Sequence, residues 1–268
     1  MSVPSSWKPP PLPPEHGAWV MLAIPLLLCL AAAGPPRAAS ILVPPAMIVL
    51  FLARAAALPA AVRVAERKAS PPGYLERRAV WASIYAAGAA AGFVAAAAAA
   101  DPPARPAALA VGSIVLLLGA AHGALALFRK DRTLGAEIVG MGALAAGAPL
   151  VLALAGQPVG ARAAGLGLLS LAYFASTAAF VRAFVLLGTR RRTAVLGCLG
   201  AHAALAVLLI GLWAASWIPA GTLVAFVPVL ARVAWGLSSP PRNVRALGWR
   251  EAWVAATFSA IAIAALVR

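Results

Sequence analysis

The sequence predicts an all-α membrane protein, a polytopic bundle of about nine transmembrane helices. Of its 268 residues, 63% are hydrophobic and only 11% are charged, whereas a soluble domain carries about 25% charged residues. The mean hydropathy of +0.92 points the same way. Apolar segments near or above the length of about 18 residues that spans a bilayer as a helix recur along the whole chain. This pattern is not that of a soluble globular protein.

The first span opens with an unusual block of residues. Prolines upstream of it cannot continue a helix, so we expect the helix to begin near Glu15. An acid in the first turn suits the positive end of the helix dipole, and Trp19 suits a position at the level of the lipid headgroups. The block reads Pro13-Pro14-Glu15-His16-Gly17-Ala18-Trp19.

Eight further apolar segments follow, joined by short connections. The nine expected spans are 17–34, 39–62, 79–100, 106–128, 134–155, 161–187, 194–214, 217–236 and 250–267. The connections contain Pro, Gly or charged residues, which favour turns and leave no room for a domain outside the membrane. We therefore divide the chain into a proline-rich cytoplasmic leader (1–14) and a single transmembrane helical domain (15–268). We expect no cleavable signal peptide, so the first span stays in the mature protein.

The basic residues alternate between connections and predict the orientation. The second, fourth, sixth and eighth connections hold three to five Lys or Arg residues each; the first, third and fifth hold one arginine each, and the seventh holds none. By the positive-inside rule, the N-terminus is cytoplasmic and the C-terminus external, in the cell inner (cytoplasmic) membrane. The net charge of +15 then reflects topogenic charge and contact with anionic lipids, not nucleic acid.

Charged side chains inside the spans are the candidates for a functional site, because each costs about 2.5–3.5 kcal/mol at the centre of a span. The predicted orientation places them in one layer near the cytoplasmic surface. One interpretation is that the arginines snorkel to headgroups and the glutamates, including Glu251 of the last span, cap helices. The other is a shared, cytoplasm-facing polar pocket, in which Arg54 and Arg182 lie close to Glu15 and Glu137. The candidate ligand-binding residues are Glu15, His16, Trp19, Arg54, His122, Arg132, Glu137, Arg182 and Arg232.

No pattern typical of metal or nucleotide binding accompanies these residues. The chain has no H-E-x-x-H motif, no G-x-S-x-G motif and no carboxylate cluster with metal-ligand spacing. Cys29 and Cys198 lie inside apolar runs, as is typical of small packing residues, and His202 alone is typical of a buried, hydrogen-bonded histidine. We therefore expect no cofactor and no metal site, and we assign no catalytic residue.

A weak internal repeat is also present. Glu15 followed by Pro25 resembles Glu137 followed by Pro149, and Arg54 in the second span resembles an arginine, Arg182, in the sixth. This spacing corresponds to two four-helix halves plus a ninth helix. The alternative is chance similarity in a sequence rich in Ala and Leu.

The opening block at 13–19 resembles the signature of the YwiC-like family of bacterial integral membrane proteins. The segments 51–54, 132–137, 147–149 and 180–182 are similar to later blocks of that family, so the resemblance covers roughly residues 10–190. It implies a polytopic bacterial membrane protein and no particular activity.

A remoter likeness concerns architecture alone. Nine helices in a 4+4+1 arrangement with a cytoplasmic N-terminus resemble the UbiA-type intramembrane prenyltransferases. Those enzymes carry Asp-rich motifs at the cytoplasmic ends of spans two and six, where Mg²⁺ holds a prenyl diphosphate. The corresponding segments here, 55–63 and 176–182, contain no Asp or Glu. Since Mg²⁺ needs oxygen ligands, we expect no Mg²⁺-dependent prenyl transfer.

Three classes of function stay open. The first is a protein that binds an amphiphile, lipid or anionic headgroup in the cytoplasm-facing pocket without Mg²⁺-dependent chemistry. The second is a small-solute or anion transporter, and the third is a divergent UbiA-like isoprenoid transferase with Glu15 or His16 as acid/base. The expected partners are membrane lipids and an isoprenoid, quinone or other amphiphilic small molecule, and no nucleic acid.

Overall fold

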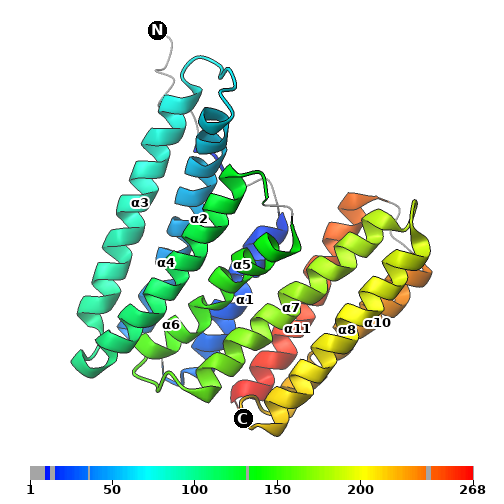
Figure 1. Ribbon diagram of the computed structural model, residues 1–268. Coiled ribbons are helices and arrows are strands. Elements are labelled where there is room, and N and C mark those ends of the chain that lie inside the picture. The colour runs from blue at the N-terminus through cyan, green and yellow to red at the C-terminus, as the bar shows by residue number, and fades with distance from the viewer. Residues whose placement is uncertain (1–9, 13–15, 36, 131–132, 240–242, 268) are drawn as a thin grey trace.

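The computed structural model of the chain describes residues 10–12, 16–35, 37–130, 133–239 and 243–267, and the regular elements in these ranges are all helices. Figure 1 shows the long helices as an up-and-down bundle, with α3 at one edge and α8 and α10 at the other. The elements are α1 (His16–Ala32), α2 (Ala38–Ala65), α3 (Tyr74–Ala99), the 3₁₀ turn η2 (Pro102–Ala104), α4 (Arg105–Leu127), α5 (Leu134–Ala145), α6 (Gly147–Leu154), α7 (Ala161–Leu186), α8 (Arg191–Ala214), α9 (Gly221–Val224), α10 (Val227–Ser238) and α11 (Val244–Val267).

The helices have the length and composition of membrane spans. Within the described residues, eight helical segments are long and apolar enough to cross a bilayer, and α1 is a shorter apolar helix. Large apolar side chains are exposed on the outer faces of several helices, for example Val94, Leu117, Val207 and Trp253. Such faces are unfavourable in water and suit contact with lipid. The polytopic helical bundle predicted from hydropathy is therefore confirmed.

Two of the nine expected spans are each broken into two helices by a proline. Pro149 has no N–H to donate to the carbonyl of Ala145, and α5 ends at Ala145. Pro228 likewise cannot donate to Val224, the last residue of α9. The eighth span, expected to begin at residue 217, begins as a helix only at Gly221. Conversely, α3 and α11 begin about one turn or more before their expected ranges, because a helix need not end where the hydrocarbon ends.

Helix α1 is the central element of the bundle. It packs against α2, α5, α6, α7 and α11. Its side chains are buried on several sides, and Leu22, Leu28 and Cys29 are almost completely enclosed. A helix that is apolar all round is expected to lie inside a larger bundle. The segment that opens the sequence thus holds the two sides of the bundle together.

Helices α2 and α3 form the most extensive helix pair. Gly88 and Gly92 lie four residues apart on α3, and a Cβ atom at Gly92 would lie only 2.9 Å from the Cβ atom of Ala46 on α2. Small residues at this spacing let two helix backbones approach closely in a membrane. This close contact fixes α3 against α2.

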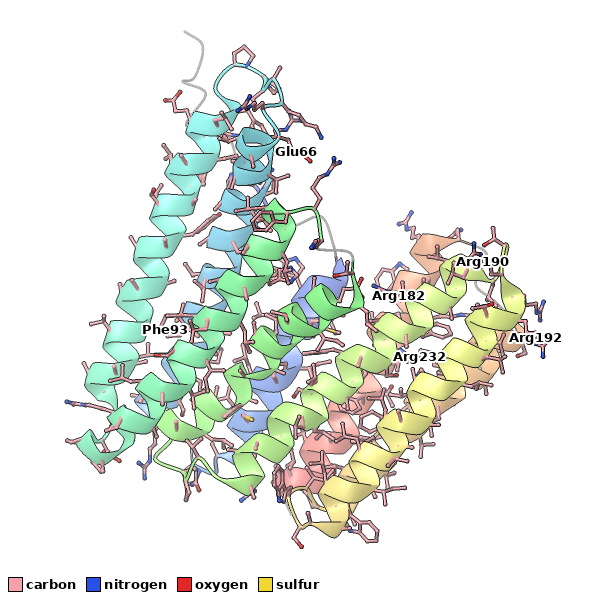
Figure 2. All side chains as sticks on the ribbon, viewed as in Figure 1. Glu66, Phe93, Arg182, Arg190, Arg192 and Arg232 are labelled. Carbon is pink, nitrogen blue, oxygen red and sulfur yellow. The ribbon has the colours of Figure 1, made fainter. Side chains whose placement is uncertain are left out.

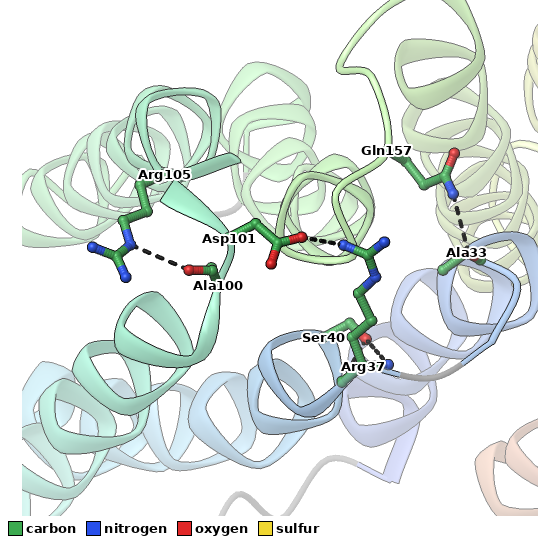
Figure 3. Close-up of polar contacts among 7 residues, drawn as sticks. All are labelled: Ala33, Arg37, Ser40, Ala100, Asp101, Arg105 and Gln157. Carbon is green, nitrogen blue, oxygen red and sulfur yellow. Dashed lines mark hydrogen bonds and ion pairs between the residues drawn. The ribbon is translucent and has the colours of Figure 1, made fainter. Parts of the chain in front are cut away.

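The connections that are rich in basic residues gather at one end of the bundle, which we call the basic end. It contains the α2–α3, α4–α5, α7–α8 and α10–α11 connections (Figure 1). At the opposite end, the Arg37 guanidinium donates to the Asp101 carboxylate over 2.5 Å, and Gln157 Nε2 donates to the Ala33 carbonyl over 3.4 Å (Figure 3). Both members of the Arg37–Asp101 pair are exposed, so the pair positions two connections and adds little stability.

Candidate functional site

Four of the predicted site residues line one cavity near the basic end. Arg54 comes from α2, His122 from α4, Glu137 from α5 and Arg182 from α7. The cavity has a volume of about 400 Å³. Its remaining walls are mainly apolar side chains of α1, α2, α4, α5 and α7, with Thr177 as a further polar group. We call it the polar cavity.

Glu137 and Arg182 form a two-point ion pair across the polar cavity. Arg182 Nε donates to Glu137 Oε2 over 3.0 Å, and Arg182 Nη2 lies 2.8 Å from Glu137 Oε1. The pairing holds the planar guanidinium in a fixed orientation. Thr133 caps the start of α5 by accepting from the backbone N–H of Ala136, so the Glu137 carboxylate is not the cap of this helix.

His122 is oriented by the backbone of α5. Its Nδ1 lies 2.9 Å from the carbonyl oxygen of Ala136. A carbonyl oxygen only accepts, so Nδ1 carries the hydrogen and Nε2 is the acceptor nitrogen of the ring. A Cβ atom at Gly140 would lie 2.6 Å from His122 Nδ1, so the glycine leaves the room that the imidazole occupies.

Arg54 and Arg182 lie on the same cavity, not on opposite outer faces of the bundle. Trp19 of α1 packs edge-to-face on Phe51, with ring centroids 5.7 Å apart, and Phe51 lies one turn before Arg54 in the cavity wall. Glu15 and Arg132 fall outside the described residues. His16 is the first residue of α1, and its side chain also falls outside the described part.

Arg232 does not line the polar cavity; it lies in a separate buried network behind it. Its side chain is only 3% exposed, and Nη1 lies 2.6 Å from the carboxylate of Glu251 on α11. Nη2 donates to Ser176 Oγ over 2.7 Å, and the guanidinium lies 4.8 Å from the centre of the Phe180 ring. The Arg182 side chain is 41% exposed by comparison, and Figure 2 labels the two arginines close together beside α7.

The network continues to α8 through a histidine. Ser176 Oγ accepts from Arg232, so its own hydrogen is directed to His202 Nε2, 2.8 Å away. His202 Nδ1 then donates to the Cys198 carbonyl over 2.8 Å. His202 is thus a buried, hydrogen-bonded histidine, as its sequence context predicts. Both cysteines are buried and free.

Thr177 connects the two groups of polar residues. It lines the polar cavity, and its hydroxyl accepts from Arg232 Nη1 over 3.3 Å. Ser176 and Thr177 were not among the predicted site residues, since hydroxyl side chains inside apolar helices carry little signal. Their position before Arg182 on α7 was the available clue. Glu251 was placed in the charged layer, but its pairing with Arg232 follows only from the packing of α10 on α11.

An apolar cavity adjoins the polar one. It lies between α2, α3, α4 and α5, has a volume of about 570 Å³, and shares Phe51, Arg54 and Gly119 with the polar cavity. Arg54 therefore stands at the junction of a polar space and an apolar space. This combination fits a molecule that has a polar head and an apolar body.

The basic end carries further charges outside the spans. Glu66, at the end of α2, lies 2.6 Å from Lys68 Nζ and 2.9 Å from Arg129 Nε. The hydrogen bond from Lys68, together with the nearby positive charges, holds the pKa of the Glu66 carboxyl below its usual value. Figure 2 places Glu66 at this end, and the contact links the α2–α3 connection to the α4–α5 connection.

The donor set within the described ranges does not resemble a metal centre. No three His, Cys, Asp or Glu side chains come together there. The polar cavity offers one described carboxylate, which is already paired with an arginine. The guanidinium groups of Arg54 and Arg182 are the groups in this cavity that are suited to binding an anion.

A comparison with known families identifies the chain. The family described as YwiC-like protein matches residues 12–152, which include Trp19, Arg54, His122 and Glu137 but not Arg182 or Arg232. The match ends before residue 190, to which the sequence resemblance was expected to reach. Searches of curated proteins and of solved structures gave no match. Because the matched region spans more than half of the chain, this multi-pass membrane protein belongs to the YwiC-like family.

Proposed function

We propose that the protein binds an anionic amphiphile, with the headgroup in the polar cavity at Arg54 and Arg182. The observation that carries the proposal is the composition of that cavity: the walls are mainly apolar, and the ionic side chains gather on Arg54, His122, Glu137 and Arg182. Binding sites for small amphiphilic molecules combine apolar walls with a few convergent polar groups. Guanidinium groups are well suited to the planar or tetrahedral oxygens of carboxylates and phosphates.

The electrostatic field at this end of the bundle supports an anionic headgroup. Lys and Arg outnumber Asp and Glu by 22 to 7 in the whole chain, and the excess is concentrated in the connections of the basic end. Clusters of Lys and Arg beside a membrane attract anionic lipids. A negatively charged headgroup is therefore concentrated at the basic end before it reaches the cavity.

We place the basic end on the cytoplasmic side of the bacterial inner membrane. The support is the alternation of basic connections along the sequence, which the positive-inside rule converts into an orientation. In this orientation the amphiphile is recognised from the cytoplasmic leaflet.

Native mass spectrometry of the purified protein with hexadecyl phosphate as the probe tests the proposal. We expect one bound probe per protein, with no requirement for Mg²⁺. Arg54→Gln and Arg182→Gln each weaken binding about tenfold or more, because a hydrogen bond to a charged group contributes about 1.5–3 kcal/mol. The uncharged analogue hexadecanol binds more weakly than the phosphate.

The control variant is Arg190→Gln, since Arg190 is exposed in the α7–α8 connection. It leaves binding unchanged if the cavity is the site. The double variant Glu137→Gln with Arg182→Gln removes both members of the ion pair and so avoids leaving a lone carboxylate. Equal loss of binding in Arg54→Gln and Arg190→Gln would show that the probe is held by the general charge of the basic end.

A further inference from the structure

Three cavities lie in a row along α4, and we call this row the groove. The polar cavity shares Phe51, Arg54 and Gly119 with the apolar cavity beside it. That apolar cavity shares Leu50 and Val115 with a third cavity of about 210 Å³. The third cavity lies between α2, α3, α4 and α6. The row of adjoining cavities therefore runs from the ionic residues of the polar cavity toward the opposite end of the bundle.

The groove follows almost the whole length of α4. Its lining on this helix begins at His122, near the basic end, and ends at Arg105, the first residue of the helix. At a rise of about 1.5 Å per residue, these positions lie roughly 25 Å apart, close to the hydrocarbon thickness of about 30 Å. Phe93, which lines the third cavity, lies toward the end of α3 that is remote from the basic end (Figure 2).

Polarity changes sharply along the groove. The ionic side chains in its walls are confined to the polar cavity, except for Arg105 at the far end. The Arg105 guanidinium donates to the backbone carbonyls of Ala98 and Ala100, which closes the end of α3. Everything between Arg54 and Arg105 is apolar apart from the serine hydroxyls, and Ser113 Oγ already donates to the Leu109 carbonyl.

We infer that this groove holds the hydrocarbon chain of the bound amphiphile, which is a single long-chain molecule with an anionic head. The inference rests on the proposed headgroup site and adds the position and number of the chains. The head lies at the polar cavity, and the chain runs beside α4 toward Phe93 and Arg105. The third cavity, of about 210 Å³, is the smallest of the three, so we place one chain in it and not two. Since bilayer tails are as apolar as the groove, the chain gives position and selectivity, while the head supplies the affinity.

Two glycines on α4 give a direct way to fill the groove. Gly119 lines the polar and the adjoining apolar cavity, and Gly112 lines the third cavity. A Cβ atom at either glycine would meet no atom within 4 Å, so a larger side chain enters the groove without a clash at its Cβ. Gly211 on α8 also has open space at its Cβ and lines none of these cavities, so Gly211→Leu is the matched control.

Photocrosslinking with two probes tests the inference on the full-length protein in vesicles. Both probes are hexadecyl phosphates; one carries a diazirine next to the phosphate and the other carries it at the end of the chain. We expect the head-proximal probe to label the peptides that contain Arg54 and His122. The chain-terminal probe labels those that contain Phe93 or Gly112. Gly112→Leu reduces labelling by the chain-terminal probe about tenfold or more, while labelling by the head-proximal probe persists. The control Gly211→Leu changes the labelling by neither probe.

The outcomes separate the chain position from the headgroup site. Head-proximal labelling at Arg54 together with chain-terminal labelling spread over the exposed faces of α8 and α11 would overturn the groove and leave the proposed function intact. If both probes label the lipid-facing surfaces of the helices without preference for the residues of the polar cavity, the groove and the proposed headgroup site are both overturned. Unchanged chain-terminal labelling in Gly112→Leu would likewise place the chain outside the groove.

Discussion

At the scale of single residues, the pair of Arg232 and Glu251 shows how the bundle holds a charge in its interior. The guanidinium is bound by a carboxylate and two hydroxyls and lies over the Phe180 ring. An unpaired charge at this depth would have to draw water into the bilayer. The arginine therefore links α10 to α7 and α11 through its side-chain contacts, and it does not snorkel to lipid.

We predict that Arg232→Ala lowers the free energy of unfolding by about 3–5 kcal/mol, because it leaves the Glu251 carboxylate buried without its partner. The double variant Arg232→Met with Glu251→Gln loses less, since it removes both charges. Thermal unfolding in detergent measures both variants against the solvated control Arg190→Ala. If Arg232→Ala lowers the free energy of unfolding no more than the control does, Arg232 does not stabilise the packing of α7, α10 and α11.

Four of the residues predicted for a shared pocket line the polar cavity, but a fifth, Arg232, does not. Arg54, His122, Glu137 and Arg182 come together because charges in spans cluster to avoid lipid. Arg232 was expected in the same pocket. It lies behind Thr177 instead, because α10 is turned so that Arg232 contacts Ser176 and Thr177 of α7 and Glu251 of α11. Depth along a helix is readable from sequence, whereas the rotation of one helix about its axis relative to its neighbours is not.

At the scale of helices, each proline inside a span removes a backbone N–H, and the carbonyl that it leaves free needs another hydrogen-bond donor. Pro59 lies inside α2 and has no N–H to donate to the carbonyl of Ala55. Arg78 of α3 supplies the missing donor, because its Nη1 lies 2.7 Å from the Ala55 oxygen. The same guanidinium lies over the Tyr74 ring, with 5.3 Å between Cζ and the ring centre. A hydrogen bond that the proline removes from α2 is thus replaced by a donor from α3.

We predict that Arg78→Ala destabilises the protein by about 1–3 kcal/mol, because the Ala55 carbonyl is left without a donor. Pro59→Ala restores a backbone N–H at that position, so Arg78→Ala costs less in a Pro59→Ala background. A double-mutant cycle of unfolding free energies measures the difference. Equal costs in both backgrounds would mean that Arg78 acts only through its contact with Tyr74.

The positions of the helices were largely predictable, whereas their internal breaks were not. Within the described residues, hydropathy located the eight helical segments that are long enough to span a bilayer and the shorter apolar helix α1, since about 20 apolar residues are required to cross the hydrocarbon. The three prolines of α2 leave that helix continuous, but Pro149 separates α5 from α6. A Cβ atom at Gly167 of α7 would lie 3.5 Å from the Ala145 oxygen, so a bare backbone approaches that break.

At the scale of the whole molecule, the up-and-down order of the helices gathers the basic connections at one end (Figure 1). The relation between two four-helix halves and the likeness to UbiA-type enzymes stay predictions. The orientation in the membrane is the property that gives the polar cavity access to one leaflet. It depends on the charge of the connections and not on the packing of the helices.

We predict that topology reporters fused after residues 70, 130, 191 and 244 are cytoplasmic, and that those fused after residues 36, 103, 158 and 268 are external. Alkaline phosphatase and green fluorescent protein fusions read the two sides in complementary ways. A pair of neighbouring fusions with inverted signals would contradict the nine-span orientation and would move the polar cavity to the other leaflet.

The most direct test of the central claim is an experimental structure of the protein in a lipid nanodisc with hexadecyl phosphate. We predict a phosphate group within hydrogen-bond distance of the Arg54 and Arg182 guanidinium groups, at the wall formed by α2 and α7. Density for the probe only at the connections of the basic end, with the polar cavity closed by side chains, would show that the headgroup does not bind at Arg54 and Arg182.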